Sequence, residues 1–158
     1  MKKIYERSGF TLVEIMIVVA IIGLLVAIGM PSFLRARKNA RVARVAKNIK
    51  VFADAFQMYC MEEGKYPLDT HLIYPASMQG YITENSWNSD ALGGSYNWEG
   101  PSWGEGGGYD YAGIALFETK ATTDELEALD SLLDDGDLST GTFRLTDNGR
   151  YTYIIEER

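Results

Sequence analysis

The longest uninterrupted apolar run of the chain lies in its first third. Residues 15–34 contain no charged side chain and only one polar one, Ser32. A helix of that length can cross the roughly 30 Å hydrocarbon core of a bilayer. We therefore predict a transmembrane segment over residues 10–34, preceded by a short basic leader at 1–9. Glu14 lies within the first turn of this segment, where a carboxylate is costly in lipid and therefore indicates a function.

A different apolar pattern follows Pro31. Apolar side chains recur at alternating spacings of four and three, which predicts one buried face of an amphipathic helix over residues 35–63. This face comprises Val45, Ile49, Phe52, Phe56 and Tyr59, with Ala46, Ala53 and Cys60 beside them. Gly64 and Pro67 predict that the helix ends near Glu63. Pro31 removes a hydrogen bond inside the helix, so we expect a kink or a locally melted turn there.

The remaining residues, 64–158, show shorter patterns that predict a globular C-terminal domain. Strands are expected at 95–98, 109–117, 142–146 and 150–155, and a short helix at 122–133 whose buried side chains are Leu126, Leu129, Leu132 and Leu133. The last two strands flank Asp147-Asn148-Gly149, a strong signal for a hairpin turn. The predicted fold class is α+β: a long N-terminal helix, apolar in its first half and amphipathic in its second, packed on a small antiparallel sheet of three or four strands.

The segment 68–108 is rich in glycine, serine, asparagine and aromatic residues, which predicts loop with one short strand. Its large aromatic side chains are Trp87, Tyr96, Trp98 and Trp103. Two interpretations are open. The rings can pack over the small sheet, which we favour, or they can form a face that binds a glycan or a protein partner.

Charge is divided unevenly along the 158 residues, whose formal net charge is -7. Residues 1–63 hold ten Lys or Arg against five Asp or Glu, and residues 64–158 hold five against seventeen. Nucleic acid is therefore excluded as a partner of the C-terminal domain, because a phosphate backbone requires clustered basic residues. The bases at 37, 41, 44 and 47 fit a solvated helix surface, or attraction to anionic lipid or to acidic faces of neighbouring subunits.

Catalytic chemistry has little support. His71 is the only histidine and Cys60 the only cysteine, so the sequence contains neither a nucleophilic triad nor the spacing of a zinc site. We predict that the protein is not an enzyme. The cluster of Asp134, Asp135 and Asp137, with Asp147 in reach, is best explained as a solvated acidic turn, with a calcium site as the alternative.

Two other interpretations of the N-terminus compete with a functional one. A secretory signal would end its apolar stretch after about 7–15 residues, whereas this run is longer and Glu14 interrupts its start. A plain membrane anchor leaves Glu14 unexplained.

The positive-inside rule would place the C-terminal domain in the cytoplasm, because more basic residues follow the span than precede it. These are Arg35, Arg37, Lys38, Arg41, Arg44, Lys47 and Lys50 against Lys2, Lys3 and Arg7.

The hexapeptide Gly9-Phe10-Thr11-Leu12-Val13-Glu14, between a basic leader and a long apolar helix, resembles the N-terminus of type IV pilins and of the pseudopilins of type II secretion. The Gly-Lys-Tyr-Pro sequence at 64–67 also resembles the end of the long pseudopilin helix. This resemblance implies cleavage by a prepilin peptidase between Gly9 and Phe10, N-methylation of Phe10, and a role for Glu14 in filament assembly. It also implies the opposite orientation from the charge rule, with the C-terminal domain outside the cytoplasm.

The resemblance implies a structural subunit of the bacterial inner membrane that assembles into a type II secretion pseudopilus. Its partners would be copies of itself, related pseudopilins, the prepilin peptidase and an inner-membrane assembly platform. No cofactor is expected, although major pseudopilins often bind calcium in a C-terminal loop. A single cysteine favours a pseudopilin over a pilin that closes a disulfide loop. A subunit of a type IV pilus and a membrane-tethered glycan- or partner-binding module remain the alternatives.

Overall fold

The computed structural model describes residues 9–158, so the predicted leader, apart from Gly9, lies outside the described residues. The first element is one helix, α1, which spans Leu12–Glu63. It ends where Gly64 adopts a φ of 74° and donates its N–H to the carbonyl of Cys60 at 2.9 Å, as the sequence predicts. The helix continues through Pro31 without interruption, so the expected melted turn is absent there. The kink stays a prediction.

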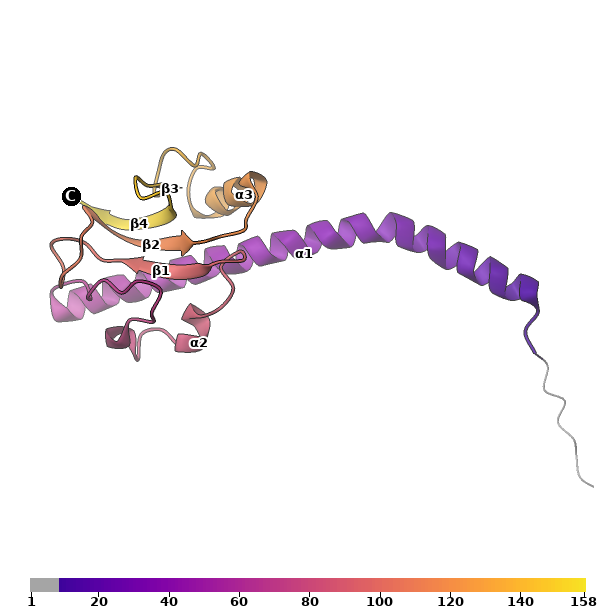
Figure 1. The fold of residues 1–158 in the computed structure, drawn as a ribbon, viewed down its shortest axis with the longest axis horizontal. Helices are drawn as coiled ribbons and strands as arrows, with labels where there is room; N and C mark the ends of the chain where they lie inside the picture. Colours follow the sequence, from indigo (N-terminus) through magenta and orange to yellow (C-terminus); the bar gives the residue numbers. More distant parts are fainter. Residues whose placement is uncertain (1–8) are drawn as a thin grey trace, which may run out of the picture. The chain divides into compact units, whose positions relative to one another are not determined.

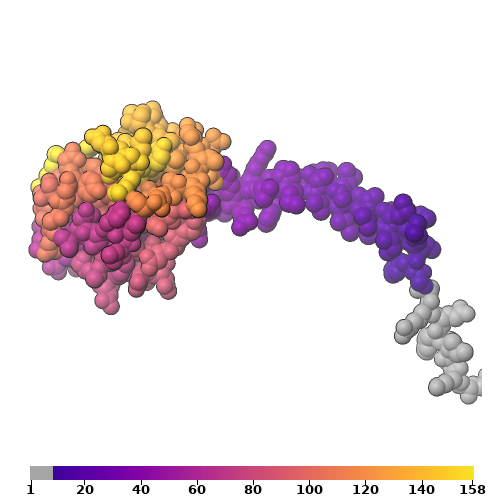
Figure 2. Space-filling model, viewed as in Figure 1, coloured from indigo at the N-terminus to yellow at the C-terminus, as the bar shows by residue number. Residues whose placement is uncertain are grey.

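The described chain divides into two compact units, with the boundary between Lys38 and Asn39. The part of α1 that belongs to the first unit is long and apolar enough to cross a membrane. Its apolar side chains stand exposed along the segment drawn in indigo and violet (Figure 2), from Phe10 to Leu34. An all-round apolar surface without partners within its own unit requires either lipid or other helices around it.

The second unit contains a four-stranded sheet that lies alongside the C-terminal half of α1 (Figure 1). Its strands are β1 (Ser95–Glu99), β2 (Tyr111–Phe117), β3 (Phe143–Leu145) and β4 (Tyr151–Glu157). The strands are paired antiparallel in the order β1-β2-β4-β3. The β3–β4 hairpin turns at the predicted residues, and Gly149 has the φ of 79° that such a turn requires. The α+β prediction is confirmed, and the sheet has the upper of the two predicted strand numbers.

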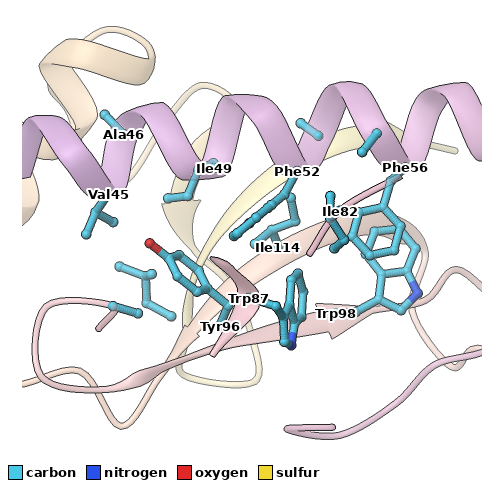
Figure 3. Packing of buried hydrophobic residues seen from close by; sticks show 14 of the residues in the cluster. Val45, Ala46, Ile49, Phe52, Phe56, Ile82, Trp87, Tyr96, Trp98 and Ile114 are labelled. Atoms are coloured by element: carbon cyan, nitrogen blue, oxygen red, sulfur yellow. The ribbon is translucent and has the colours of Figure 1, made fainter. Parts of the chain in front are cut away.

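The core of this unit forms between α1 and the sheet (Figure 3). All five residues of the predicted helix face are buried, and the rings of Phe52 and Phe56 point into the sheet. Phe56 stacks on Trp98 with ring centroids 3.8 Å apart, and Phe52 meets Tyr96 edge to face at 5.1 Å. Trp87 is also buried against both phenylalanines. The aromatic binding face considered as an alternative is therefore wrong for three of its four rings, because they fill the core.

Three short helices complete the unit. The strongest prediction among them is α3 (Thr123–Leu133), where Thr122 and Glu125 form a capping box. Leu126 and Leu129 are buried as expected, whereas Leu132 is exposed, so its predicted burial is wrong. The other two, a 3-10 turn at Ala76–Met78 and α2 (Glu84–Trp87), lie in the segment predicted as loop. Both are too short to produce a helical period in the sequence.

Candidate functional site

The predicted cleavage site lies immediately before α1. Gly9 and Phe10 precede the helix and are exposed, with 83% of Phe10 accessible to solvent. A side chain added at Gly9 would meet no atom within 4 Å. Within the described part of the chain, nothing covers the peptide bond between these two residues, so an enzyme can reach it. Access alone does not identify a cleavage site, so the roles of both residues remain proposals.

Glu14 has a partner within its own subunit. Its Oε2 accepts hydrogen bonds from the backbone N–H and the hydroxyl of Thr11, both at 2.8 Å. The hydroxyl oxygen of Thr11 in turn accepts from the Glu14 N–H at 3.2 Å. This reciprocal arrangement is a capping box, which satisfies two otherwise unpaired N–H groups of the first turn. Sequence reasoning singled out Glu14 and missed Thr11, although Thr-x-x-Glu is the signature of such a cap.

An acidic cluster lies at the C-terminal end of α3. Carboxylate oxygens of Asp130, Asp134 and Asp135 lie within 4.8 Å of one another. Asp130 is fully buried, and neither of its carboxylate oxygens has a hydrogen-bond partner among the described residues. Burial, and secondarily the neighbouring carboxylates, raise the pKa of Asp130 to about 6, against a smaller opposing effect of the backbone N–H of Gly136. Sequence reasoning missed this residue because it lies within the helix, one turn before the predicted cluster.

The other predicted acids are arranged differently. Asp137 lies outside the cluster, and its carboxylate accepts from the N–H and hydroxyl of Ser139 at 3.0 and 2.6 Å. These bonds lower the pKa of Asp137. Asp147 belongs to the β3–β4 turn and is likewise outside the cluster. Of the four acids that the sequence groups together, Asp134 and Asp135 therefore belong to the cluster, whereas Asp137 and Asp147 do not.

Hydrogen bonds in the loop after α3 hold two carboxylates of the cluster in place. Asp135 accepts from the N–H of Asp137 at 2.8 Å and from the hydroxyl of Thr140 at 2.9 Å, and Asp134 accepts from the N–H of Thr142. These bonds fix two carboxylates next to the buried Asp130. The C-terminus of a helix carries partial negative charge, which disfavours three carboxylates and favours a cation. Carboxylates are also the ligands that calcium prefers.

The basic residues of α1 are partly engaged inside the subunit. Arg41 donates two hydrogen bonds to the carboxylate of Asp90, at 2.9 and 3.1 Å, and Arg44 adds a third at 3.2 Å. The first of these arginines is the main reason that the pKa of Asp90 is lowered. The side chains of Arg41 and Arg44 are 38% and 52% exposed, so the prediction of a solvated helix surface holds for them. Their bonds to Asp90 also hold the loop before β1 against the helix.

The two residues considered for catalysis contact neighbouring side chains. The ring of His71 lies edge to face on Phe117, with centroids 4.9 Å apart. Cys60 is half-buried beside the core, and burial raises the pKa of its thiol. A raised thiol pKa disfavours the reactive thiolate.

Comparison with known proteins identifies the N-terminal segment. Residues 6–30 match the prokaryotic N-terminal methylation motif. The type II secretion system core protein G of Pseudomonas aeruginosa is 40% identical over 39% of this chain and 44% of that protein. The type IV major pilin protein PilA of Myxococcus xanthus is 40% identical over 39% of this chain and 28% of that protein. The core protein G of Escherichia coli K12 is 27% identical over 77% of this chain and 90% of that protein.

The match to the first relatives spans less than half of their length. No solved structure matches the chain. The relatives are nevertheless uniform in kind, since they are pilins and type II secretion core proteins. The N-terminal segment of the chain is therefore similar to the same segment of type IV pilins and of type II secretion core proteins, and it continues into a long helix that is apolar at its start and packed on an antiparallel sheet at its end.

Proposed function

We propose that the chain is a structural subunit that is cleaved between Gly9 and Phe10, N-methylated at Phe10, and assembled through α1 into a type II secretion pseudopilus. The observation that carries this proposal is the placement of Glu14. It is a carboxylate in the first turn of an exposed apolar helix, directly after an accessible Gly-Phe bond. The match of this segment to the N-terminal methylation motif supports it.

The proposed mechanism depends on charge pairing in an apolar setting. Cleavage creates an ammonium group on Phe10, and Glu14 of one subunit pairs with that group of its neighbour. Before assembly, Thr11 satisfies the Glu14 carboxylate, which reduces the cost of holding it near the membrane. In a bundle of apolar helices an unpaired carboxylate is strongly unfavourable, so the intersubunit pair fixes the position of each new subunit along the filament.

The proposed location follows from the same features. The N-terminal part of α1 is a single candidate span, which is consistent with single-pass anchoring in the inner membrane. We place the C-terminal domain on the extracytoplasmic side because the similarity of the N-terminal segment to pilins and secretion core proteins favours it, although the positive-inside rule favours the opposite orientation. The partners in this proposal are further copies, related pseudopilins, the prepilin peptidase and an assembly platform.

Two substitutions test processing and assembly separately. We expect Gly9→Val to block cleavage and to leave a membrane-held precursor with its full N-terminal mass. We expect Glu14→Leu to be processed and inserted normally but to yield few or no filaments in cells. The conservative Val13→Leu, next to Glu14, is the matched control and retains filaments. Normal filaments from Glu14→Leu would contradict the pairing mechanism.

A type IV pilus is the second candidate, favoured by the match to the Myxococcus pilin over the N-terminal segment. The two assignments differ in the defect that deletion produces. Loss of a pseudopilus subunit abolishes export of secreted proteins, whereas loss of a pilus subunit removes surface filaments and leaves export intact. Deletion with complementation by the intact chain distinguishes them.

We also propose that Asp130, Asp134 and Asp135 hold a divalent cation, with calcium the chemically best match. The buried and unpartnered carboxylate of Asp130 supports this, since a cation would satisfy both of its oxygens. Calcium would supply positive charge at the end of α3 and would tie the following loop to the helix. We expect calcium to raise the Tm of the detergent-solubilised chain, and Asp130→Asn to abolish that rise. Asp147→Asn is the control that retains it.

A further inference from the structure

Two arginines mark the end of the apolar part of α1. Arg35 and Arg37 follow Leu34, the last residue of the apolar run, and both are exposed. Charged residues bound this run on both sides, since Glu14 precedes it and Arg35 follows it. As a helix, residues 15–34 span about 30 Å, which equals the thickness of the hydrocarbon core of a bilayer. Both arginines therefore lie within about 5 Å of the core boundary, at the level of the lipid headgroups.

The two arginines lie on opposite sides of the helix. Successive residues of an α-helix are rotated by about 100°, so positions 35 and 37 are about 200° apart around its axis. Lys38 lies between these two directions and adds a third base. A protein partner on one side of α1 cannot contact both arginines, whereas the headgroup layer surrounds a single span and meets both of them.

The charges of Arg35 and Arg37 are not neutralised by the helix that carries them. Between Glu14 and Asp54, every charged residue of α1 is basic. Helical ion pairs form at spacings of three or four, so neither arginine has an acidic neighbour within reach on α1. Neither takes part in the ion pairs that the structure shows over residues 9–158. The two side chains thus hold positive charge at the headgroup level.

A guanidinium group suits the phosphate of a lipid. Its planar fork of N–H groups bonds two phosphate oxygens at once, and it is more weakly hydrated than an ammonium group. A zwitterionic lipid brings its own cation beside the phosphate, so it neutralises little of the arginine charge. An anionic lipid has a net negative charge and is therefore preferred. Near an anionic surface this preference is about fivefold for each basic residue.

We propose that Arg35 and Arg37 form a binding surface for anionic phospholipid in the leaflet that adjoins the C-terminal domain. The inference rests on the proposed membrane anchoring and holds for either orientation of the chain. The lipid contact keeps the first turn after the span at the headgroup level. In the proposed assembly, the contact is given up when α1 leaves the bilayer for the filament.

The lipid selectivity of the full chain in vesicles tests this proposal. Phosphatidylcholine vesicles that contain the chain receive a trace of spin-labelled phosphatidylglycerol or of spin-labelled phosphatidylcholine, and electron spin resonance measures how much of each lipid the protein immobilises. The probe averages over the whole perimeter of the span, so we expect the parent to prefer phosphatidylglycerol by about two- to fivefold. Arg35→Gln with Arg37→Gln should lower that preference by about twofold or more. The basic leader is the same in every variant, so the difference reports on the two arginines.

Two controls separate charge at the headgroup level from the net charge of the protein. Lys47→Gln removes an exposed base about 18 Å further along α1 than Arg35, and we expect no change from it. Arg35→Lys with Arg37→Lys keeps both charges and should keep most of the preference.

Three results would overturn the lipid contact and leave the proposed anchoring standing. They are a parent without any preference, a double glutamine variant that keeps the preference of the parent, and an equal loss from Lys47→Gln. A parent chain that alkaline carbonate extracts from the vesicles would instead contradict the proposed anchoring itself.

Discussion

At the first turn of α1, Thr11 is the residue on which the position of the Glu14 carboxylate depends. Its hydroxyl donates to Glu14 and accepts from the Glu14 N–H. Removing a cap of this kind costs about 1 kcal/mol. We expect Thr11→Val to fray the turn and to speed amide exchange at Glu14 about fivefold in detergent micelles. Thr11→Ser keeps the hydroxyl and should exchange like the parent, so equal rates in all three chains would contradict the cap.

The raised pKa of Asp130 predicts that the free energy of unfolding depends on pH when no divalent cation is bound. Its pKa is about 6 in the folded chain but near 3.9 when unfolded, so the folded state binds more protons between these values. The free energy of unfolding therefore falls as pH rises from about 4 to about 6, by at most about 3 kcal/mol. Denaturant unfolding with a chelator present measures this.

The Asp130→Asn variant is the control for that measurement. It has no carboxylate to ionise, so the decline in the free energy of unfolding between about pH 4 and pH 6 should disappear. If the variant shows the same slope as the parent, another group is responsible. Asp130 also shows why the sequence could not define the cluster: its burial depends on where α3 packs, which no local pattern encodes.

At the scale of elements, Glu99 joins three strands and a turn. Its buried carboxylate accepts from the hydroxyls of Tyr111 on β2 and Thr152 on β4, at 2.9 and 3.0 Å. The amide of Asn148 and the guanidinium of Arg150 complete the set at 2.7 and 2.9 Å. Every oxygen lone pair is thus directed to a donor from another element, which ties the β3–β4 hairpin to β1 and β2.

Removing the charge partner of Glu99 should destabilise the sheet. Arg150→Ala leaves a buried carboxylate without its cation, at a cost of about 3 kcal/mol or more. Glu99→Gln combined with Arg150→Ala should cost less than the sum of the two single changes, because the stranded charge is gone. Arg144→Ala, which breaks the exposed pair with Glu157, is the control and should cost less than about 1 kcal/mol. Equal losses from the two arginine variants would contradict the burial argument.

Some features of the fold are determined by residues that are close in the sequence, and others join residues that are far apart in it. The helix face ending at Tyr59, the capping box at Thr122 and the turn at Gly149 follow from neighbouring residues, and all three were predictable. The Glu99 network and the clamp of Arg41 on Asp90 join residues about fifty positions apart. Their partners become neighbours only when the sheet has formed, so composition and period could not reveal them.

At the scale of the whole molecule, the division after Lys38 predicts that the C-terminal unit folds without the apolar part of α1. The first buried core residue is Val42, so a fragment that begins at Asn39 loses no core side chain. We expect this fragment to be soluble and to unfold cooperatively, with a Tm within a few degrees of that of the detergent-solubilised chain. Calorimetry and circular dichroism measure both properties.

A shorter fragment sharpens that prediction, because it separates the core from the membrane segment. Beginning at Lys47 removes Val42, Val45 and Ala46, all of them buried. Burying each valine contributes about 1.5–3 kcal/mol, so the loss of both, about 3–6 kcal/mol, reaches the lower end of the roughly 5–15 kcal/mol by which such domains are stable. We expect the shorter fragment to be unfolded. If the fragment from Asn39 were unfolded as well, the apolar half of α1 would be required for folding, and the two units could not be independent.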